Sequence, residues 1–487
     1  MTCRINIPGS ARIAIALLTA VIAARANDRP EKPEKRPNVL FIAIDDLNDW
    51  VSCLGGHPQA KTPNIDQLAS RGLLFTNAYC SAPGCNASRS SLLTGLRPST
   101  TGIYANAHDW RQAPNLKDAI TLPAHFKANG YITLGTGKLF HAHTFFDKKN
   151  LSGYPDPDAW VDYFPSPTQQ MPEEVVPENW PVNSSRKFYA GHFDWSALQI
   201  PKSDMADAKV VSWATKQLAR KYDAPLFLSV GIYRPHVPWY VPQKYFDHFP
   251  IDEIKLPEYL QHDLNDTPQA AAKLTKRSWH KWIIKNRQWK KAVQGYLASM
   301  AFADDMVGEL LKALDNGPMA KNTIIILWGD HGYHLGEKEH WEKFALWEDT
   351  THVPLIIFDP KRTRPGTRCQ NPVSLLDLYP TLIEICGLKK TPQELEGQSL
   401  ARQISSPNKK INRVAISTHG RNNHAVRSSR YRYIRYADNT EELYDHHEDP
   451  NEWRNLADEQ EMNEIKKQHS ALLPKHNAAP MKSTNQK

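Results

Sequence analysis

A single cysteine opens the polar stretch from Cys85 to Arg89, at a point where the sequence predicts the start of a helix. Structural cysteines are usually surrounded by apolar residues, whereas Cys85 is followed by small polar ones. In a helix that begins there, Cys85 and Arg89 lie one turn apart on one face, and the helix N-terminus favours bound negative charge. We therefore predict that Cys85 is a nucleophile that handles an anion. A disulfide with Cys80 is the alternative.

Four predicted strands each end in ionisable residues. Taken strand by strand, these residues are Asp45 with Asp46, Lys138 with His141, Arg234 with His236, and Asp330 with His331. In open parallel sheets, ligands bind beyond the carboxyl ends of the strands. We therefore expect these side chains to form one site.

The carboxylates of Asp45, Asp46 and Asp330 would repel one another unless a cation or a proton neutralised them. A set rich in oxygen ligands suits a hard divalent ion such as Ca²⁺ or Mg²⁺. A single aspartate is more simply a helix cap or a turn residue. An Asp-Asp pair that ends one strand, matched by Asp330 and His331 at the end of another, favours a metal site instead.

Three cations, Arg89, Lys138 and Lys343, are expected at the same rim. Cations beside a divalent metal need an anionic ligand between them, and a tetrahedral sulfate or phosphate would bridge both. A proton for a leaving oxygen could come from one of the histidines, which are His141, His236 and His331. Further histidines stand nearby in the sequence, each more simply structural, namely His143, His334, His340 and His352.

The elements that must position these residues are strands alternating with helices. This order predicts an α/β fold with a mostly parallel sheet covered by helices on both faces. The predicted strands are 38–45, 131–136, 224–231, 323–329 and 353–358. The predicted helices are 62–72, 123–129, 203–222, 288–315 and 374–387, with Ser203 and Ser374 as N-caps.

The pattern changes after about residue 400. Short strands joined by polar turns predict a small antiparallel sheet, and a last helix is predicted over 459–473. The predicted strands are 414–418, 425–428, 432–436 and 442–444. The segment 251–290 reads as an irregular insertion rich in Lys, Trp and His.

Composition and the N-terminus limit the class of protein. The 487 residues, 40% hydrophobic and 23% charged, suit a soluble globular chain of two domains. The net charge of +8 comes without a basic block, so no nucleic-acid partner is expected. Residues 1–26, with an apolar run at 13–24, predict a signal peptide and hence a secreted or periplasmic protein without stable membrane insertion.

The motifs together resemble the type I, formylglycine-dependent sulfatases. Cys85 to Arg89, followed by Leu-Thr-Gly at 93–95 and Pro98, resembles the family signature, with Ala87 as the less common alternative to proline. Further resemblances lie at 37–46, 62–69, 330–337 and 442–456. Segments 137–141 and 234–238, with His331 and Lys343, resemble the iduronate-2-sulfatase-like branch.

This resemblance implies an alkaline-phosphatase-like catalytic domain over 37–400 and a C-terminal subdomain over 401–487. It implies that Cys85 is oxidised to Cα-formylglycine, either by a formylglycine-generating enzyme or by an anaerobic sulfatase-maturing enzyme. It also implies Ca²⁺, held by the modified Cys85 and by Asp45, Asp46, Asp330 and His331.

The resemblance further implies a mechanism. One hydroxyl of the aldehyde hydrate attacks sulfur, His236 protonates the leaving alcohol, and the second hydroxyl then expels sulfate. Arg89 would hold the hydrate with His141 nearby, and Lys138 and Lys343 would neutralise sulfate oxygens. His236 and the two lysines would thus also bind substrate.

The implied activity is sulfuric ester hydrolysis on sulfated saccharides. Contacts to sugar could come from 279–289, although an amphipathic helix with buried aromatic residues explains that segment equally well. Other candidates to line the pocket are Asn106, His108, Trp110 and Arg111. The alternatives are a phosphatase or phosphodiesterase of the alkaline phosphatase superfamily, and a non-catalytic protein that binds sulfated glycans.

Overall fold

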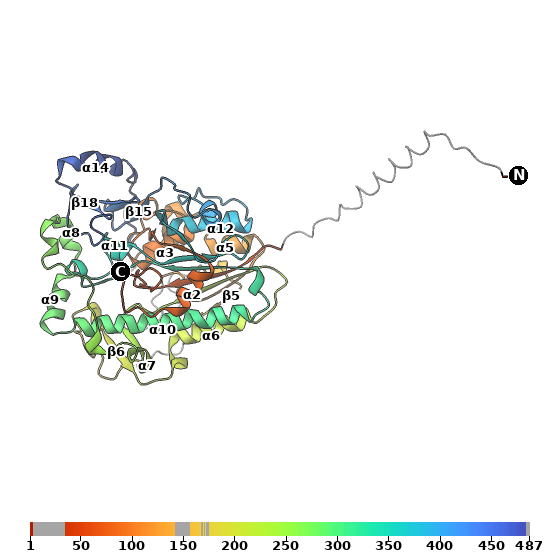
Figure 1. Cartoon of the computed structure of the whole chain (residues 1–487), viewed down its shortest axis with the longest axis horizontal. Coiled ribbons are helices and arrows are strands. Elements are labelled where there is room, and N and C mark those ends of the chain that lie inside the picture. Colours follow the sequence, from red (N-terminus) through yellow and green to blue (C-terminus); the bar gives the residue numbers. More distant parts are fainter. Residues whose placement is uncertain (3–34, 142–155, 167–168, 170, 172–174, 484–487) are drawn as a thin grey trace. The chain divides into compact units, whose positions relative to one another are not determined.

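The computed structural model describes residues 1–2, 35–141, 156–166, 169, 171 and 175–483 (Figure 1). Of the predicted signal peptide, only residues 1–2 are described, and His143 lies outside the described residues. Residues Pro37–Lys487 form one compact unit. Within the described residues, no helix combines the length and the apolar character that a membrane crossing needs.

An eight-stranded sheet is the centre of this unit, in the order β13-β2-β12-β9-β1-β7-β4-β5. Its strands are β1 (Asn38–Ile44), β2 (Leu73–Phe75), β4 (Ile132–Gly137), β5 (Asp162–Phe164), β7 (Leu226–Ile232), β9 (Thr323–Gly329), β12 (Leu355–Phe358) and β13 (Thr367–Cys369). The strands β4, β7, β1 and β9 are parallel neighbours, and β12 is antiparallel to both β9 and β2. The prediction of a mostly parallel sheet is confirmed, with β12 as a reversed strand.

The register of the parallel strands aligns their carboxyl ends. Ile44 at the end of β1 is level with Ile232 of β7 and with Gly329 of β9. Gly137 at the end of β4 is level with Gly231 of β7. The residues that follow these four strands therefore leave the sheet at one edge.

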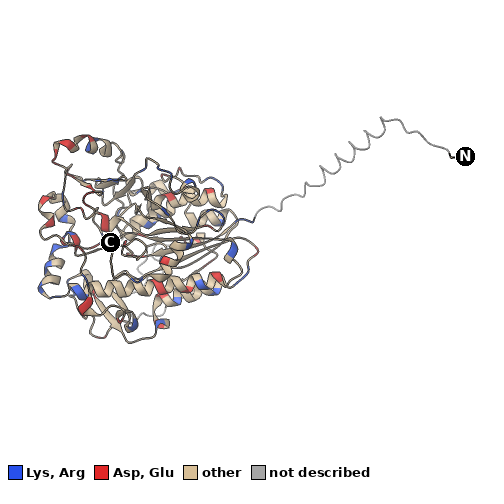
Figure 2. Ribbon diagram, in the orientation of Figure 1, with Lys and Arg blue, Asp and Glu red and all other residues tan. Residues whose placement is uncertain are grey.

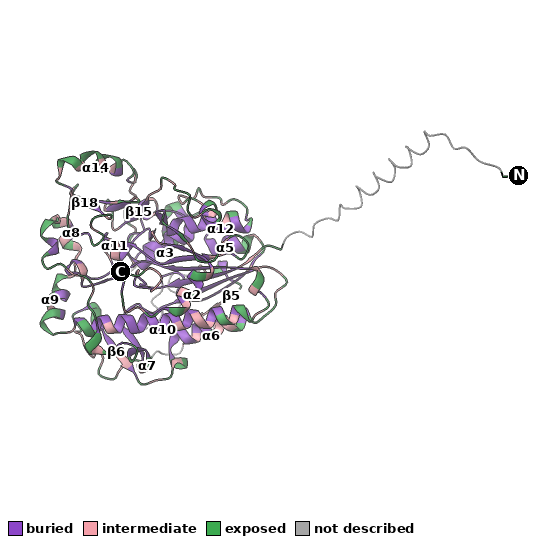
Figure 3. Ribbon diagram, viewed as in Figure 1, coloured by how far each residue is buried: buried purple, intermediate pink, exposed green. Residues whose placement is uncertain are grey.

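Helices cover both faces of the sheet, as predicted. Successive side chains of β1 point to opposite faces, so Leu40 and Ile42 pack in one core and Val39 and Phe41 in the other. The first core contains residues of α2 (Pro63–Arg71), α6 (Ala206–Leu218) and α10 (Trp289–Asp315), and the second those of α3 (Cys85–Thr94), α5 (Leu122–Ala128) and α12 (Leu378–Cys386). Figure 3 shows α3 and most of α10 as buried, with exposed residues on α6 and α12.

Two predicted features differ in the structure. Ser203 does not cap α6, because it lies in a 3₁₀ turn, Lys202–Asp204, where its hydroxyl bonds the Asp204 side chain; Met205 is the residue before the helix. The segment 251–290 is not irregular throughout, since it contains α8 (Gln269–Leu274) and α9 (Arg277–Lys285). Ser374 caps the 3₁₀ turn Leu375–Asp377 that leads directly into α12, through a capping box with Asp377.

The small antiparallel sheet after residue 400 is confirmed. Its strands, in order, are β15 (Ala415–Thr418), β16 (His424–Arg427), β17 (Tyr431–Arg435) and β18 (Glu441–Asp445), followed by α14 (Asn463–Ser470). Ser417 donates to the Cys80 carbonyl at 2.6 Å, so the edge of this sheet holds the segment that leads to Cys85.

Short elements complete the chain. They are β3 (Ala78–Tyr79), β6 (Trp195–Leu198), β8 (Trp239–Pro242), β10 (His334–Leu335), β11 (Trp341–Glu342), β14 (Val373–Ser374), α4 (Pro98–Thr101), α7 (Gln243–Phe246), α11 (Glu348–Thr351) and α13 (Ala401–Ser405). Basic and acidic residues are mixed along the helices, α10 and α14 among them (Figure 2).

The Asp304 side chain of α10 links this helix to α2. Its buried carboxylate accepts hydrogen bonds from the backbone N–H groups of Asn64 and Ile65, at 3.2 and 2.8 Å, in the first turn of α2. We expect Asp304→Ala to lower the free energy of unfolding by about 1–3 kcal/mol, because it leaves buried donors unpaired. The matched control is Asp315→Ala on the same helix, which removes an exposed pair with Arg71 and should cost less than about 1 kcal/mol. Equal shifts in the urea midpoint of the two variants would contradict this role.

Candidate functional site

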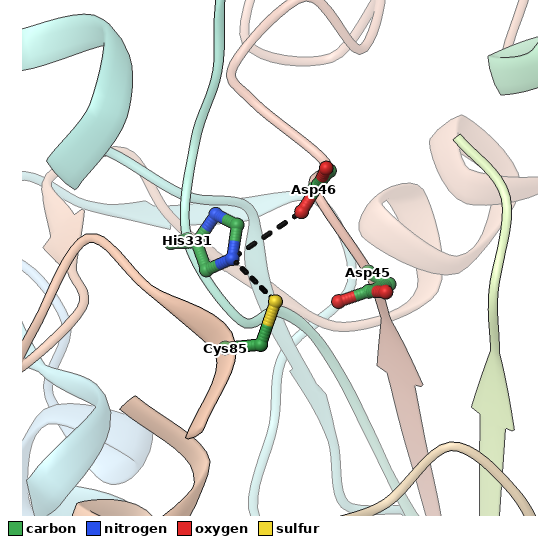
Figure 4. Close-up of side chains that lie close together, drawn as sticks. All are labelled: Asp45, Asp46, Cys85 and His331. Carbon is green, nitrogen blue, oxygen red and sulfur yellow. Dashed lines mark hydrogen bonds and ion pairs between the residues drawn. The ribbon is translucent and has the colours of Figure 1, made fainter. Parts of the chain in front are cut away.

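Helix α3 begins at Cys85 beneath the edge where the parallel strands end. The Cys85 side chain is fully buried. Its Sγ lies 3.1 Å from Nζ of Lys343, 3.7 Å from Nζ of Lys138 and 3.2 Å from Nε2 of His331. Figure 4 shows the His331 ring between the Cys85 sulfur and the Asp46 carboxylate. The thiol therefore lies among cations, as an anion-handling group would.

Hydrogen bonds from outside the helix hold the first turn of α3. The side chain of Asn106 accepts from the backbone N–H of Asn86 at 3.1 Å, and the carbonyl of His108 accepts from the Asn86 amide at 2.7 Å. The Ser88 hydroxyl donates to the Asp330 carbonyl at 2.5 Å. Asn106 and His108, predicted as pocket residues, thus position the helix start.

The surrounding cations change the ionisation of Cys85. Burial raises the pKa of its thiol, but Lys138, Lys343 and His331 outweigh this and hold the pKa well below the ordinary value. His141 adds a side-chain hydrogen bond that lowers the pKa of Cys85 further. Cys80 is the opposite case, because burial raises the pKa of its thiol. Both thiols are free, so the Cys80–Cys85 disulfide does not form.

Arg89 of α3 links the carboxylates that follow β1 and β9, which are Asp45 and Asp330. Its Nε donates to Asp330 at 2.7 Å, one Nη donates to Asp45 at 3.1 Å, and the other Nη donates to the carbonyls of Lys138 and Leu139. Arg89, Asp45 and Asp330 are fully buried. Burial raises the pKa of Asp330 to about 6, whereas for Asp45 the charges of Lys138 and Arg89 outweigh burial and lower the pKa. Arg89 is thus a positioning residue for the carboxylates.

Asp46 faces the centre of the cluster. Its Oδ1 accepts from Lys343 at 2.8 Å and lies 3.3 Å from Nε2 of His331. Its Oδ2 is buried and has no hydrogen-bond partner among the described residues. Asp330 Oδ1 accepts from the backbone N–H of Asp46, which has φ of 56°, so the left-handed turn aims the carboxylate inward.

These residues fit a hard divalent cation. Asp45, Asp46, Cys85 and His331 each offer a ligand atom within 4.8 Å of the others. The free Oδ2 of Asp46 and the carboxylate oxygens of Asp45 match the oxygen ligands that Ca²⁺ prefers. For His331, burial lowers the pKa, but Asp330 and Cys85 outweigh it and raise the pKa to about 9.

The strands β4 and β7 bring in Lys138 and His236. A Cβ at Gly231 would lie 2.2 Å from the Lys138 carbonyl, so glycine there allows the backbone of Lys138 to turn across the strand end. Lys138 Nζ then donates to Asp45. His236 Nδ1 lies 2.6 Å from the Val237 carbonyl, and its Nε2 lies 3.9 Å from Asp46 Oδ2.

The structure thus brings together the ten residues to which the sequence assigned a catalytic or metal-binding role, whereas Arg234 donates to the Tyr240 carbonyl. The ten residues are Asp45, Asp46, Cys85, Arg89, Lys138, His141, His236, Asp330, His331 and Lys343. The sequence did not point to Tyr189, whose phenol pKa is raised first by burial and is also shifted by the charges of Lys343 and Cys85. No motif surrounds Tyr189, because a long loop and not a strand end brings it to the site.

Trp279 and Trp289 of the segment 279–289 are buried and are not exposed surfaces for a sugar. Trp279 is buried against Phe193, with ring centroids 4.6 Å apart, and Trp289 donates to the Leu335 carbonyl at 2.7 Å. Trp110 is also buried and stacks on Phe140. The alternative of an amphipathic helix with buried aromatic residues is therefore confirmed for Trp279.

Comparisons with known proteins show which family this chain resembles. The Sulfatase family matches residues 37–388, and the family described as N-sulphoglucosamine sulphohydrolase, C-terminal, matches residues 336–478. A "Sulfatase" of Formosa agariphila is 41% identical, over 96% of this chain and 92% of the relative. Human iduronate 2-sulfatase is 30% identical, over 78% and 74%. A solved 2-O GAG sulfatase is similar in structure, with a TM-score of 0.68, 24% identity and coverage of 90% and 91%.

Arg89→Ala tests the charge balance beneath the site. The substitution leaves Asp45 and Asp330 buried without their shared guanidinium, so we expect the free energy of unfolding to fall by about 3–5 kcal/mol. Arg454→Ala is the control, because Arg454 is 73% exposed in its pair with Glu459 and should contribute about 0–1 kcal/mol. The measurement is chemical denaturation followed by tryptophan fluorescence. An Arg89→Ala protein as stable as the Arg454→Ala protein would refute the pairing role.

Proposed function

The chain belongs to the sulfatase family and is a sulfatase, and from this premise we propose that it is an exported, formylglycine-dependent enzyme that removes sulfate from sulfated saccharides. The observation that carries the proposal is the buried Cys85, with two lysine ammonium groups directed at its Sγ. The 30% sequence identity to human iduronate 2-sulfatase supports a sulfated uronic acid or a related sulfated sugar as substrate. The predicted signal peptide supports export to the periplasm or the medium.

In this proposal Asp45, Asp46, Asp330 and His331 hold Ca²⁺ together with the modified Cys85. When bound, the ion would supply a Lewis acid that polarises a sulfate oxygen. Arg89 and the backbone N–H of Asp46 would hold Asp330 in place beside the ion, and Asp46 Oδ2 would offer it an oxygen without another partner.

Cys85 in this proposal is the precursor of Cα-formylglycine, made by a formylglycine-generating or anaerobic sulfatase-maturing enzyme. The aldehyde hydrate would supply the oxygen nucleophile. The position of Cys85 at the first residue of α3 supports this role, because the helix N-terminus and the lysines favour negative charge at that atom.

Lys138 and Lys343 would bind the sulfate oxygens. Their Nζ atoms approach the same sulfur from different elements and are also paired with Asp45 and Asp46. These ion pairs keep the ammonium groups in place before the substrate binds. Preorganised charge of this kind is usually the largest contribution to transition-state stabilisation.

His236 would donate a proton to the leaving alcohol. Its Nδ1 bonds the Val237 carbonyl, and its ring packs on Tyr233 with centroids 4.7 Å apart. The ring is therefore fixed with Nε2 facing the cluster, where it can hold a proton for the leaving oxygen. His141 would orient the nucleophile from the other side, and Arg89 would hold the carboxylates beside it.

Cys85→Ala tests the nucleophile. We expect it to abolish sulfate release from aryl sulfate and from defined sulfated saccharides, whereas Cys53→Ala, at a half-buried thiol outside the cluster, should retain activity. Peptide mass spectrometry of the active enzyme should show the Cys85 side chain –CH₂SH replaced by –CHO. Full activity with an unmodified thiol would refute the mechanism, and faster hydrolysis of aryl phosphate than of aryl sulfate would favour the phosphatase alternative.

Lys343→Ala tests the electrostatic role of the lysines. Loss of one preorganised cation at the sulfate should lower kcat/KM by about 10²–10³-fold. Lys321→Ala is the control, since Lys321 lies before β9, at the opposite end of that strand from Asp330, and is exposed. Steady-state kinetics on an aryl sulfate would show the difference, and an unchanged kcat/KM in Lys343→Ala would exclude sulfate binding by Lys343.

A further inference from the structure

A second group of metal-ligating side chains lies on the loop between β9 and β12. His334, Glu337 and Asp349 each offer a ligand atom within 4.8 Å of the others. His334 Nδ1 lies 3.3 Å from Asp349 Oδ2 and 3.8 Å from Glu337 Oε2. None of these residues belongs to the cluster around Cys85, and the proposed sulfatase mechanism does not use them.

The unpaired ring nitrogens of His334 indicate that this side chain binds a ligand. It is fully buried, and neither of its nitrogens has a hydrogen-bond partner among the described residues. Buried polar groups are nearly always hydrogen-bonded, because an unpaired one costs about 1–3 kcal/mol. The neighbouring His340, 5.2 Å away between ring centroids, shows the ordinary case, since both its nitrogens are bonded, to the Lys276 N–H and the Lys343 carbonyl.

Glu337 and Asp349 place two carboxylates beside His334. In the described part of the chain, the ion pairs of Glu337 and Asp349 run only to His334. The Lys338 ammonium is turned away, toward Asp263 and the Glu452 carbonyl. Burial, together with the charges of Glu337 and Asp49, raises the pKa of Asp349. A divalent cation would neutralise these carboxylates and occupy the imidazole nitrogen.

We propose that His334, Glu337 and Asp349 bind a divalent cation of the Zn²⁺ class. One imidazole nitrogen and two carboxylates are a donor set that zinc accepts, with water as a further ligand. A surface cleft of about 760 Å³, lined by Asp49, Glu337 and Asp349 among others, gives solvent and ions access to the group.

The proposed site lies where it can fasten the loop that carries Lys343. The backbone N–H groups of Gly332 and Tyr333 donate to the carbonyls of Thr350 and Asp349, so the two ends of the loop already run side by side. A cation bound by His334 and Asp349 would link the two ends of the loop a second time, through side chains in addition to the backbone hydrogen bonds. It would thereby stabilise the segment that brings Lys343 to Cys85.

The test measures metal binding without using activity. Chelator-treated protein, refilled with Ca²⁺, is incubated with Zn²⁺, desalted and analysed for zinc per chain by elemental mass spectrometry. We expect the wild type to retain one zinc per chain, and His334→Gln and Asp349→Asn to weaken binding about tenfold or more. Asp349 is part-exposed, so Asp349→Asn should fold even where His334→Gln does not.

Asp46→Asn is the matched control, because it alters the other cluster and should leave zinc binding unchanged. Zinc should also raise the Tm of the wild type and of Asp46→Asn but not of Asp349→Asn. Absence of retained zinc in the wild type would refute the proposal. Zinc lost in Asp46→Asn and kept in Asp349→Asn would also refute it, since the ion would then belong to the site around Cys85. Neither result depends on whether the proposed sulfatase mechanism is correct.

Discussion

Charge balance in a buried space is the constraint on which the site depends. Carboxylates from two strand ends lie in the same interior as Arg89, Lys138 and Lys343, and each removed from water alone would cost several kcal/mol. The arrangement is stable because the charges alternate: Arg89 lies between Asp330 and Asp45, and Lys343 lies between Asp46 and Cys85. The free oxygen of Asp46 is where this pattern leaves room for a cation.

The sheet makes this balance possible. Because β4, β7, β1 and β9 are parallel and in register at their ends, their backbones deliver charged residues to one edge while their apolar residues remain in the two cores. The helix α3 adds Cys85 from one face of the sheet, and the small C-terminal sheet braces the segment before it through Ser417. The ionisation of Cys85 therefore depends on residues that come from several of these elements, Lys138, Lys343 and His331 among them.

The loop after β9 has two functions in this view. Its beginning, Asp330 and His331, belongs to the cluster around Cys85, and Lys343 returns to that cluster further along. Between them, His334 and Glu337 face Asp349 at the end of the loop. One loop thus combines the charges proposed for sulfate binding with a second group of ligands that would fix its shape.

Much of the fold and the site could be predicted from the sequence. Apolar runs ending in Asp45, Asp330 or Lys138 identify strands and their functional ends, because backbone periodicity and strand-end chemistry are local properties. The start of α6 after Met205 rather than at Ser203, and the helices within 251–290, could not be predicted, and the sequence could not decide between the two interpretations of Trp279, because packing partners distant in the sequence decide these features. Residue types and order determined which groups take part. Only the tertiary structure decided which charges pair, that Arg89 bonds carboxylates and that His334 faces Asp349, because pairing energies depend on distances between segments that the linear sequence does not contain.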